Sequence, residues 1–143
     1  MAASVVELPA QSSALEDAFP NINFGISPLG SRVLVQVRLP KEKSTGGIIL
    51  SEYTKEAEQD NTQVAKVIAV GPLAFKNRET MKPWPEGAWC KVGDYIVVPK
   101  YAGARWRRKA PNRADMKVEF VIFNDLDMLG MVEIDPLDVQ AYI

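Results

Sequence analysis

Several short stretches of this chain either alternate apolar and polar residues or are rich in β-branched residues, and both patterns predict β-strands. Residues 32–38 and 118–123 alternate, whereas 64–70, 94–98 and 128–134 are apolar runs bounded by turn residues. In the first of them, Val33, Val35 and Val37 fall on one face of a strand. Gly, Pro, Asn or Asp residues separate the stretches, and no long amphipathic helix interrupts them. The pattern therefore predicts an all-β sandwich or barrel.

The two ends of the chain lack this pattern. Residues 1–24 are rich in Ala, Ser, Gln and Pro, with no sustained period, so we expect a flexible or loosely docked extension with a weak helix over 13–18 at most. The strand patterns define a domain over residues 25–134, and residues 135–143 form a short C-terminal tail.

The composition of the chain argues against several classes of function. The 143 residues suit one domain. The 17 basic and 18 acidic residues nearly cancel, so overall charge favours neither a nucleic acid nor a membrane partner. The single cysteine, Cys90, has no intrachain partner and suits a reducing compartment, so we expect a cytoplasmic protein. The N-terminus has no basic lead into an apolar stretch, so we expect no secretory signal. No histidine is present, which removes the commonest general base and metal ligand. We expect no enzyme, no metal site and no cofactor.

Two connections, 39–62 and 72–89, exceed the length of about 12–15 residues at which structureless loops become uncommon. Such loops are usually functional or disordered. The first is polar except for Ile48, Ile49 and Leu50, which follow the pair Gly46-Gly47. An exposed apolar triplet in a polar tract indicates a binding segment. The alternative is a short core strand after a Gly-Gly turn.

Several motifs give the chain a family resemblance when they are taken in order. They are Ser27-Pro28-Leu29-Gly30-Ser31-Arg32-Val33, Lys43-Ser44-Thr45-Gly46-Gly47-Ile48-Ile49-Leu50, Lys66-Val67-Ile68-Ala69-Val70-Gly71, Lys91-Val92-Gly93-Asp94, Pro99-Lys100-Tyr101-Ala102-Gly103 and Asp127-Met128-Leu129-Gly130. Together, from about residue 26 to 133, they resemble the GroES co-chaperonins. Ser31 departs from the family pattern, which usually has Asp at this place.

The resemblance implies a small irregular β-barrel that assembles into a heptameric ring. It implies that 39–62 is a mobile loop whose residues Gly46 to Leu50 dock, through Ile48, Ile49 and Leu50, on a GroEL-like chaperonin. The partner would bind and hydrolyse ATP, and the ring would close the chamber that holds unfolded protein substrates. The 72–89 segment would be the roof hairpin, with Phe75 and Trp84 among its aromatic residues. These aromatics would face the chamber or a neighbouring roof, although we slightly favour that Trp84 and Trp89 pack on their own domain.

A basic cluster over residues 105–113 supports an alternative from another class. Arg105, Arg107, Arg108, Lys109 and Arg113 surround Trp106. Cations beside an aromatic ring are typical of OB-like barrels that bind single-stranded nucleic acid. Acidic residues elsewhere balance the charge, so we favour a solvated loop or a subunit contact and expect no nucleic acid partner. Cys90 is expected to be a small structural residue.

Overall fold

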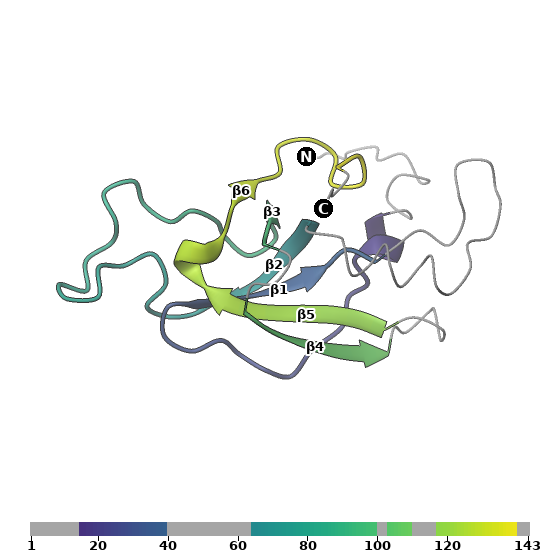
Figure 1. Ribbon diagram of the computed structural model, residues 1–143, viewed down its shortest axis with the longest axis horizontal. Coiled ribbons are helices and arrows are strands. Elements are labelled where there is room, and N and C mark those ends of the chain that lie inside the picture. Colours follow the sequence, from purple (N-terminus) through teal and green to yellow (C-terminus); the bar gives the residue numbers. More distant parts are fainter. Residues whose placement is uncertain (1–14, 40–63, 100–102, 110–116, 140–143) are drawn as a thin grey trace, which may run out of the picture.

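The computed structural model describes residues 15–39, 64–99, 103–109 and 117–139, and these residues form one antiparallel six-stranded sheet (Figure 1). The strand order is β4-β5-β1-β2-β3-β6. The elements are β1 (Arg32–Val37), β2 (Val64–Val70), β3 (Tyr95–Val97), β4 (Ala104–Lys109), β5 (Lys117–Asn124), the 3₁₀ turn η1 (Asp125–Asp127) and β6 (Gly130–Met131). The expected all-β class is confirmed.

Strand β1 lies at the centre of the sheet, and both of its faces are covered. Val33, Val35 and Val37 point into the main core together with residues of β2, β3 and β5, as their alternation predicted. Leu34 points the other way, into a second apolar cluster with Phe120 of β5. Every residue of β1 except Arg32 is therefore buried, because both faces of the strand are covered.

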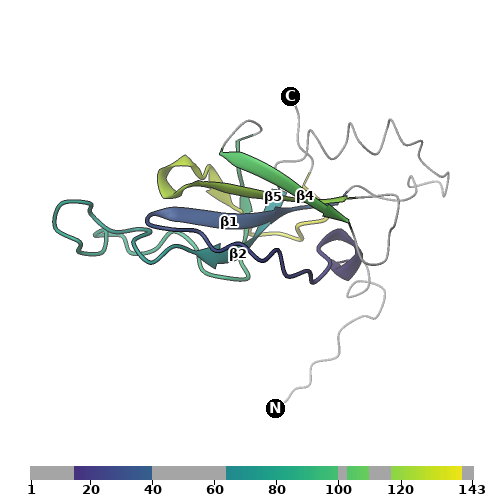
Figure 2. The same ribbon diagram turned by 90° about the horizontal axis from the view of Figure 1, so that it is seen from below.

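The N-terminal segment covers the second face of the sheet. Figure 2 shows residues 15–24 (purple) running beneath β1 from a single helical turn at 15–18. The ring of Phe24 stacks on Phe120 with 4.2 Å between centroids. The buried Gln36 amide donates to the carbonyl of Pro20 at 2.9 Å. The described part of the N-terminal extension is thus docked on the sheet, because its aromatic side chains bury apolar area without any regular spacing. Residues 1–14 lie outside the described part.

Two strands differ from the sequence expectation. β4 was expected to be a loop, yet all six of its residues pair with β5. β6 is only two residues long, although a strand was expected over 128–134. Gly103, just before β4, explains the close approach of the chain to β5. Its φ is +62°, and a Cβ there would lie 2.0 Å from the carbonyl oxygen of Ile122.

Candidate interaction surfaces

The segment that contains Gly46 to Leu50 begins and ends at one end of the sheet. Residues 40–63 lie outside the described chain, so the placement of the apolar triplet stays a prediction. Its two attachment points are described. The last residue pair between β1 and β2 is Val37 and Ala65, and the Arg38 amide donates to the Val64 carbonyl at 3.0 Å. Both ends of the segment therefore leave the sheet side by side.

The 72–89 segment projects from the opposite end of the sheet, as the teal loop in Figure 1 shows. An isolated antiparallel bridge joins Lys76 to Pro83, so its outer part is a hairpin. Phe75 is only 4% exposed and packs in the main core. The ring of Trp84 meets the ring of Phe75 edge-on, with 5.5 Å between the ring centroids. The ring centroids of Trp84 and Trp89 are 4.8 Å apart. These aromatics pack against one another and against their own domain.

A buried carboxylate that the sequence analysis missed holds the base of this hairpin. Asp125 is 5% exposed, and its side chain accepts a hydrogen bond from the Phe75 amide at 2.8 Å. Phe75 has a φ of 62°, which disfavours most residues other than glycine. The hydrogen bond and the burial of the ring offset that strain. A buried acid directly after β5 gives no distinct sequence signal, since Asp at a strand end usually caps a turn.

The basic cluster divides between the two faces of β4. Arg105 and Arg107 lie on one face, where both bind the carboxylate of Glu119, a β5 residue that is only 3% exposed. Trp106 points to the other face, with its ring 6.0 Å from that of Phe24. Arg108 on that side donates to the backbone carbonyl of Asn23. Two of the cations are thus bound to an internal acid, which weakens the nucleic acid interpretation. Arg113 is not among the described residues.

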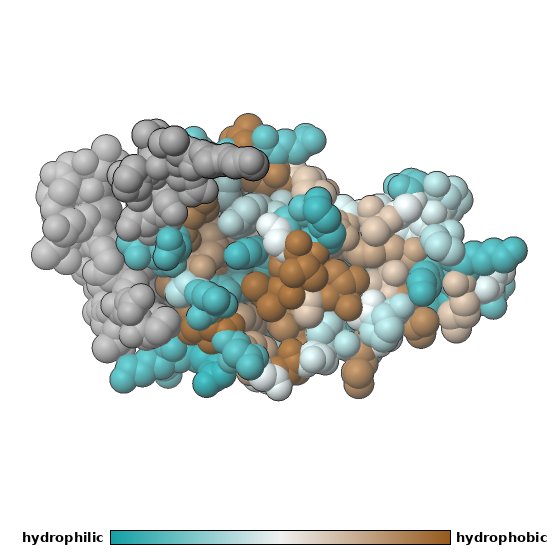
Figure 3. All heavy atoms as spheres, turned by 180° about the vertical axis from the view of Figure 1, so that it is seen from behind, coloured by the Kyte–Doolittle hydropathy of each residue, from teal (hydrophilic) through white to brown (hydrophobic). Residues whose placement is uncertain are grey.

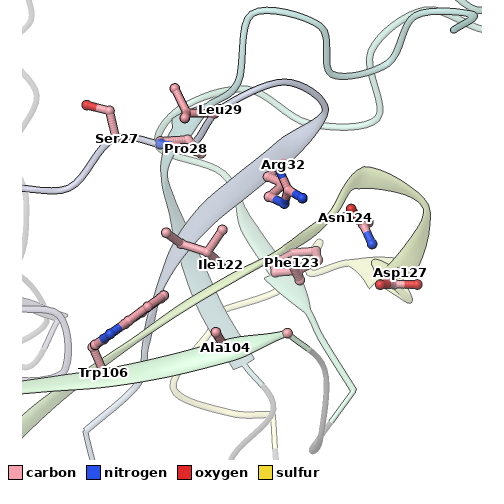
Figure 4. A pocket seen from close by; sticks show the side chains of 11 residues that line it. Ser27, Pro28, Leu29, Arg32, Ala104, Trp106, Ile122, Phe123, Asn124 and Asp127 are labelled. Carbon is pink, nitrogen blue, oxygen red and sulfur yellow. The ribbon is translucent and has the colours of Figure 1, made fainter.

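An open pocket of about 440 Å³ lies beside β4 and β5 (Figure 4). Leu29, Ile122 and Trp106 approach it from three different segments. Leu29 is 72% exposed and Trp106 is 41% exposed, which is unusual for such large apolar side chains. In the space-filling view of Figure 3, apolar side chains gather over the middle of one face. The exposed Leu29 and Trp106 side chains beside the pocket suit an apolar partner.

The edge of the sheet formed by β6 also exposes apolar side chains. β6 pairs with β3 on one side and is the last strand in the order. The large apolar residues exposed around it are Leu126, Leu129, Met131 and Ile134. An edge strand with exposed apolar side chains is an open template for pairing with another chain.

The remaining site predictions concern chemistry. Cys90 is 6% exposed in the main core, as expected for a structural residue, and burial together with the nearby Asp94 raises its pKa from 9.0 to about 11. Among the described residues, no group of three or more His, Cys, Asp or Glu side chains could hold a metal ion. In the same residues, no helix is long and apolar enough to span a membrane.

Known proteins match most of the chain. Residues 25–132 match the family described as chaperonin 10 Kd subunit. Co-chaperonin GroES of Lactococcus lactis subsp. cremoris (strain MG1363) is 35% identical over 108 residues, which cover 76% of this chain and 99% of that protein. Co-chaperonin GroES of Tetragenococcus halophilus is 32% identical over the same length, with the same coverage. Both the N-terminal segment before residue 25 and the tail after 132 fall outside the family match.

Proposed function

Since this chain belongs to the chaperonin 10 Kd subunit family, we propose that it caps a GroEL-like chaperonin ring and closes the chamber in which unfolded proteins fold. The family match over residues 25–132 carries this proposal, because it includes the whole sheet and both long connections. The chain has no catalytic site of its own in this proposal, and the partner binds and hydrolyses ATP. The relatives are bacterial proteins, which supports a cytoplasmic location.

The contact with the chaperonin is made by Ile48, Ile49 and Leu50, with Gly46-Gly47 as the turn before them. Burial of each aliphatic side chain contributes about 1.5–3 kcal/mol. Ordering of a flexible segment costs roughly 2–5 kcal/mol, so one loop binds weakly. Several loops on one ring raise the overall affinity by orders of magnitude. Weak single contacts and strong combined ones allow the cap to bind and to leave.

The ring is built by joining two different surfaces of neighbouring subunits. One surface is the apolar pocket with Leu29 and Trp106, and the other is the β6 edge with Leu129 and Met131. Two unlike surfaces on one subunit give a head-to-tail contact, and such contacts close into rings when the rotation fits. The family resemblance leads us to propose seven subunits. Closure also covers the exposed β6 edge, which a free subunit would leave open.

The replacement of Ile49 by Ser tests the chaperonin contact. It removes about 1.5–3 kcal/mol of burial per loop, and the losses add over the ring, so capture of a GroEL-like ring in the presence of ATP should fall by orders of magnitude. Thermal stability and native mass should stay at the wild-type values. Val92→Ser, at a residue that is 61% exposed on a turn, is the matched control and should bind normally.

Each possible result of this experiment has a clear meaning. Lost binding together with lost stability would show that the triplet is a core strand. Unchanged binding by Ile49→Ser would refute its role as the anchor. Failure of the wild-type protein to bind any GroEL-like ring, combined with salt-dependent binding to single-stranded nucleic acid, would favour the alternative function.

A further inference from the structure

Two segments outside the family match meet at one place in the fold. Residues 15–24 precede the match and residues 133–139 follow it. Both pack at the end of the sheet from which the 40–63 segment departs. A third apolar cluster joins them, with Phe19 from the first segment, Leu137 and Val139 from the second, and Val64 and Tyr95 from the sheet.

The N-terminal segment is fixed directly to the last described residue before the 40–63 segment. The amide of Leu39 donates to the carbonyl of Ala18 at 2.9 Å. Phe19 is 5% exposed, and its ring lies 5.1 Å from that of Tyr95. Val64, the first described residue after the segment, is 1% exposed in the same cluster. Residues 18 and 19 thus contact both attachment points.

The C-terminal tail is fixed by Arg38. One guanidinium nitrogen, Nη1, donates to the carbonyls of Pro136 and Val139, each at 2.6 Å. A turn in the tail orients these carbonyls toward Arg38. In this turn the Asp135 side chain accepts a hydrogen bond from the Leu137 amide at 2.9 Å. The backbone amide of Arg38 meanwhile bonds the carbonyl of Val64. A single residue therefore connects the tail to both attachment points.

We propose that residues 15–24 and 133–139 form a clasp that holds the base of the 40–63 segment and sets the direction in which the segment leaves the sheet. The clasp consists only of described residues, with Arg38 and Phe19 at its centre. A fixed base leaves the segment fewer conformations, so less entropy is lost when it binds. Its effect on chaperonin binding rests on the proposed function, whereas its effect on the base does not.

Arg38→Gln is the test, because it shortens the side chain and removes its charge while leaving the backbone bonds to Val64 intact. Arg78→Gln is the matched control. Arg78 Nη1 donates to the Ser31 hydroxyl at 2.6 Å, an equally short single contact at the other end of β1. The full-length variants would be compared by amide exchange at Leu39 and Asp138, whose amides donate to Ala18 and Asp135, by thermal unfolding, and by capture of a GroEL-like ring in ATP.

The clasp predicts a selective effect. Amide exchange at Leu39 and Asp138 should become roughly tenfold faster in Arg38→Gln, because opening of the clasp then no longer has to break the contacts of the guanidinium. Capture should weaken roughly tenfold or more, since a small loss per loop is multiplied over the ring. Arg78→Gln should change neither quantity. If Arg38→Gln does not fold, a chain that ends at Ile134 removes the tail and leaves all six strands in place.

The outcomes separate the clasp from the proposed function. Unchanged exchange and unchanged capture in Arg38→Gln would overturn the clasp even if the wild-type protein binds the chaperonin. Capture that weakens equally in Arg78→Gln would also overturn it, because a general loss of stability would then be the cause. If the wild-type protein does not bind a chaperonin, the proposed function fails. Exchange that is faster only in Arg38→Gln would still support the clasp.

Discussion

Glu119 is the most consequential buried charge in the described part of the sheet, and its replacement by Gln should destabilise the protein. The residue lies on β5, directly opposite Arg107 in the register of β4 and β5. Its side chain is 3% exposed, and its two oxygens bind two different arginines. Oε2 accepts from Nη1 of Arg105, and Oε1 accepts from Nε of Arg107 at 3.1 Å. Gln keeps the shape but loses the charge and one acceptor.

The size of the effect follows from this geometry. Removal of one partner from a buried ion pair costs about 3–5 kcal/mol, because the remaining charge is left without compensation. Here the remaining side chains reach water, since Arg105 is 24% exposed and Arg107 is 45% exposed. Water therefore recovers part of the cost, and we expect a loss of about 2–3 kcal/mol. For a chain of this size, that corresponds to a fall in Tm of roughly 5–10 °C.

Urea unfolding followed by tryptophan fluorescence measures this loss. Protein concentration must be the same for all variants, because assembly stabilises the folded state by mass action. Lys91→Gln is the control: Lys91 is 84% exposed and pairs with Asp94 at 3.2 Å, so its loss should cost no more than about 0.5 kcal/mol. A loss in Glu119→Gln below about 1 kcal/mol, or equal to that of the control, would refute the reasoning.

Two further predictions concern the core and the assembly. The pKa of Cys90 is raised from 9.0 to about 11, chiefly by burial, so the folded state favours the neutral thiol. Stability should be complete below pH 9 and should fall by about 3 kcal/mol between pH 9 and 11. Urea unfolding of Cys90→Ala should lose this decline, while the decline that Tyr95, whose pKa burial also raises, adds above pH 10 should remain; an unchanged profile would contradict the assignment. Leu129→Asp, at a residue 64% exposed beside β6, should lower the native mass from a ring to a monomer without changing the far-ultraviolet spectrum. A ring that persists would place the subunit contact elsewhere.

The sequence alone determined most of the sheet. The alternation around Val33, Val35 and Val37 predicted β1, and the structure places these residues in the main core. The same kind of pattern predicted β2, β3 and β5 to within a few residues. It succeeded because short runs rich in β-branched and aromatic residues, bounded by Gly, Pro, Asn or Asp, favour strands whether one face or both faces are buried. Cys90 was predicted to be a structural residue, from the absence of any visible activating group, and it is buried in the main core.

Only the tertiary structure decided the rest. β4 is a strand because its arginines meet the buried Glu119 of β5, although its own polar residues show no strand pattern. The sequence only slightly favoured packing of Trp84 on its own domain, whereas the structure shows its contact with Phe75 directly. The role of Ile48, Ile49 and Leu50 stays a prediction, because they lie beyond the described residues. The meeting of Phe19, Arg38 and the C-terminal tail joins positions about a hundred residues apart. Contacts between such distant positions leave no period in the sequence, so only folding brings them together.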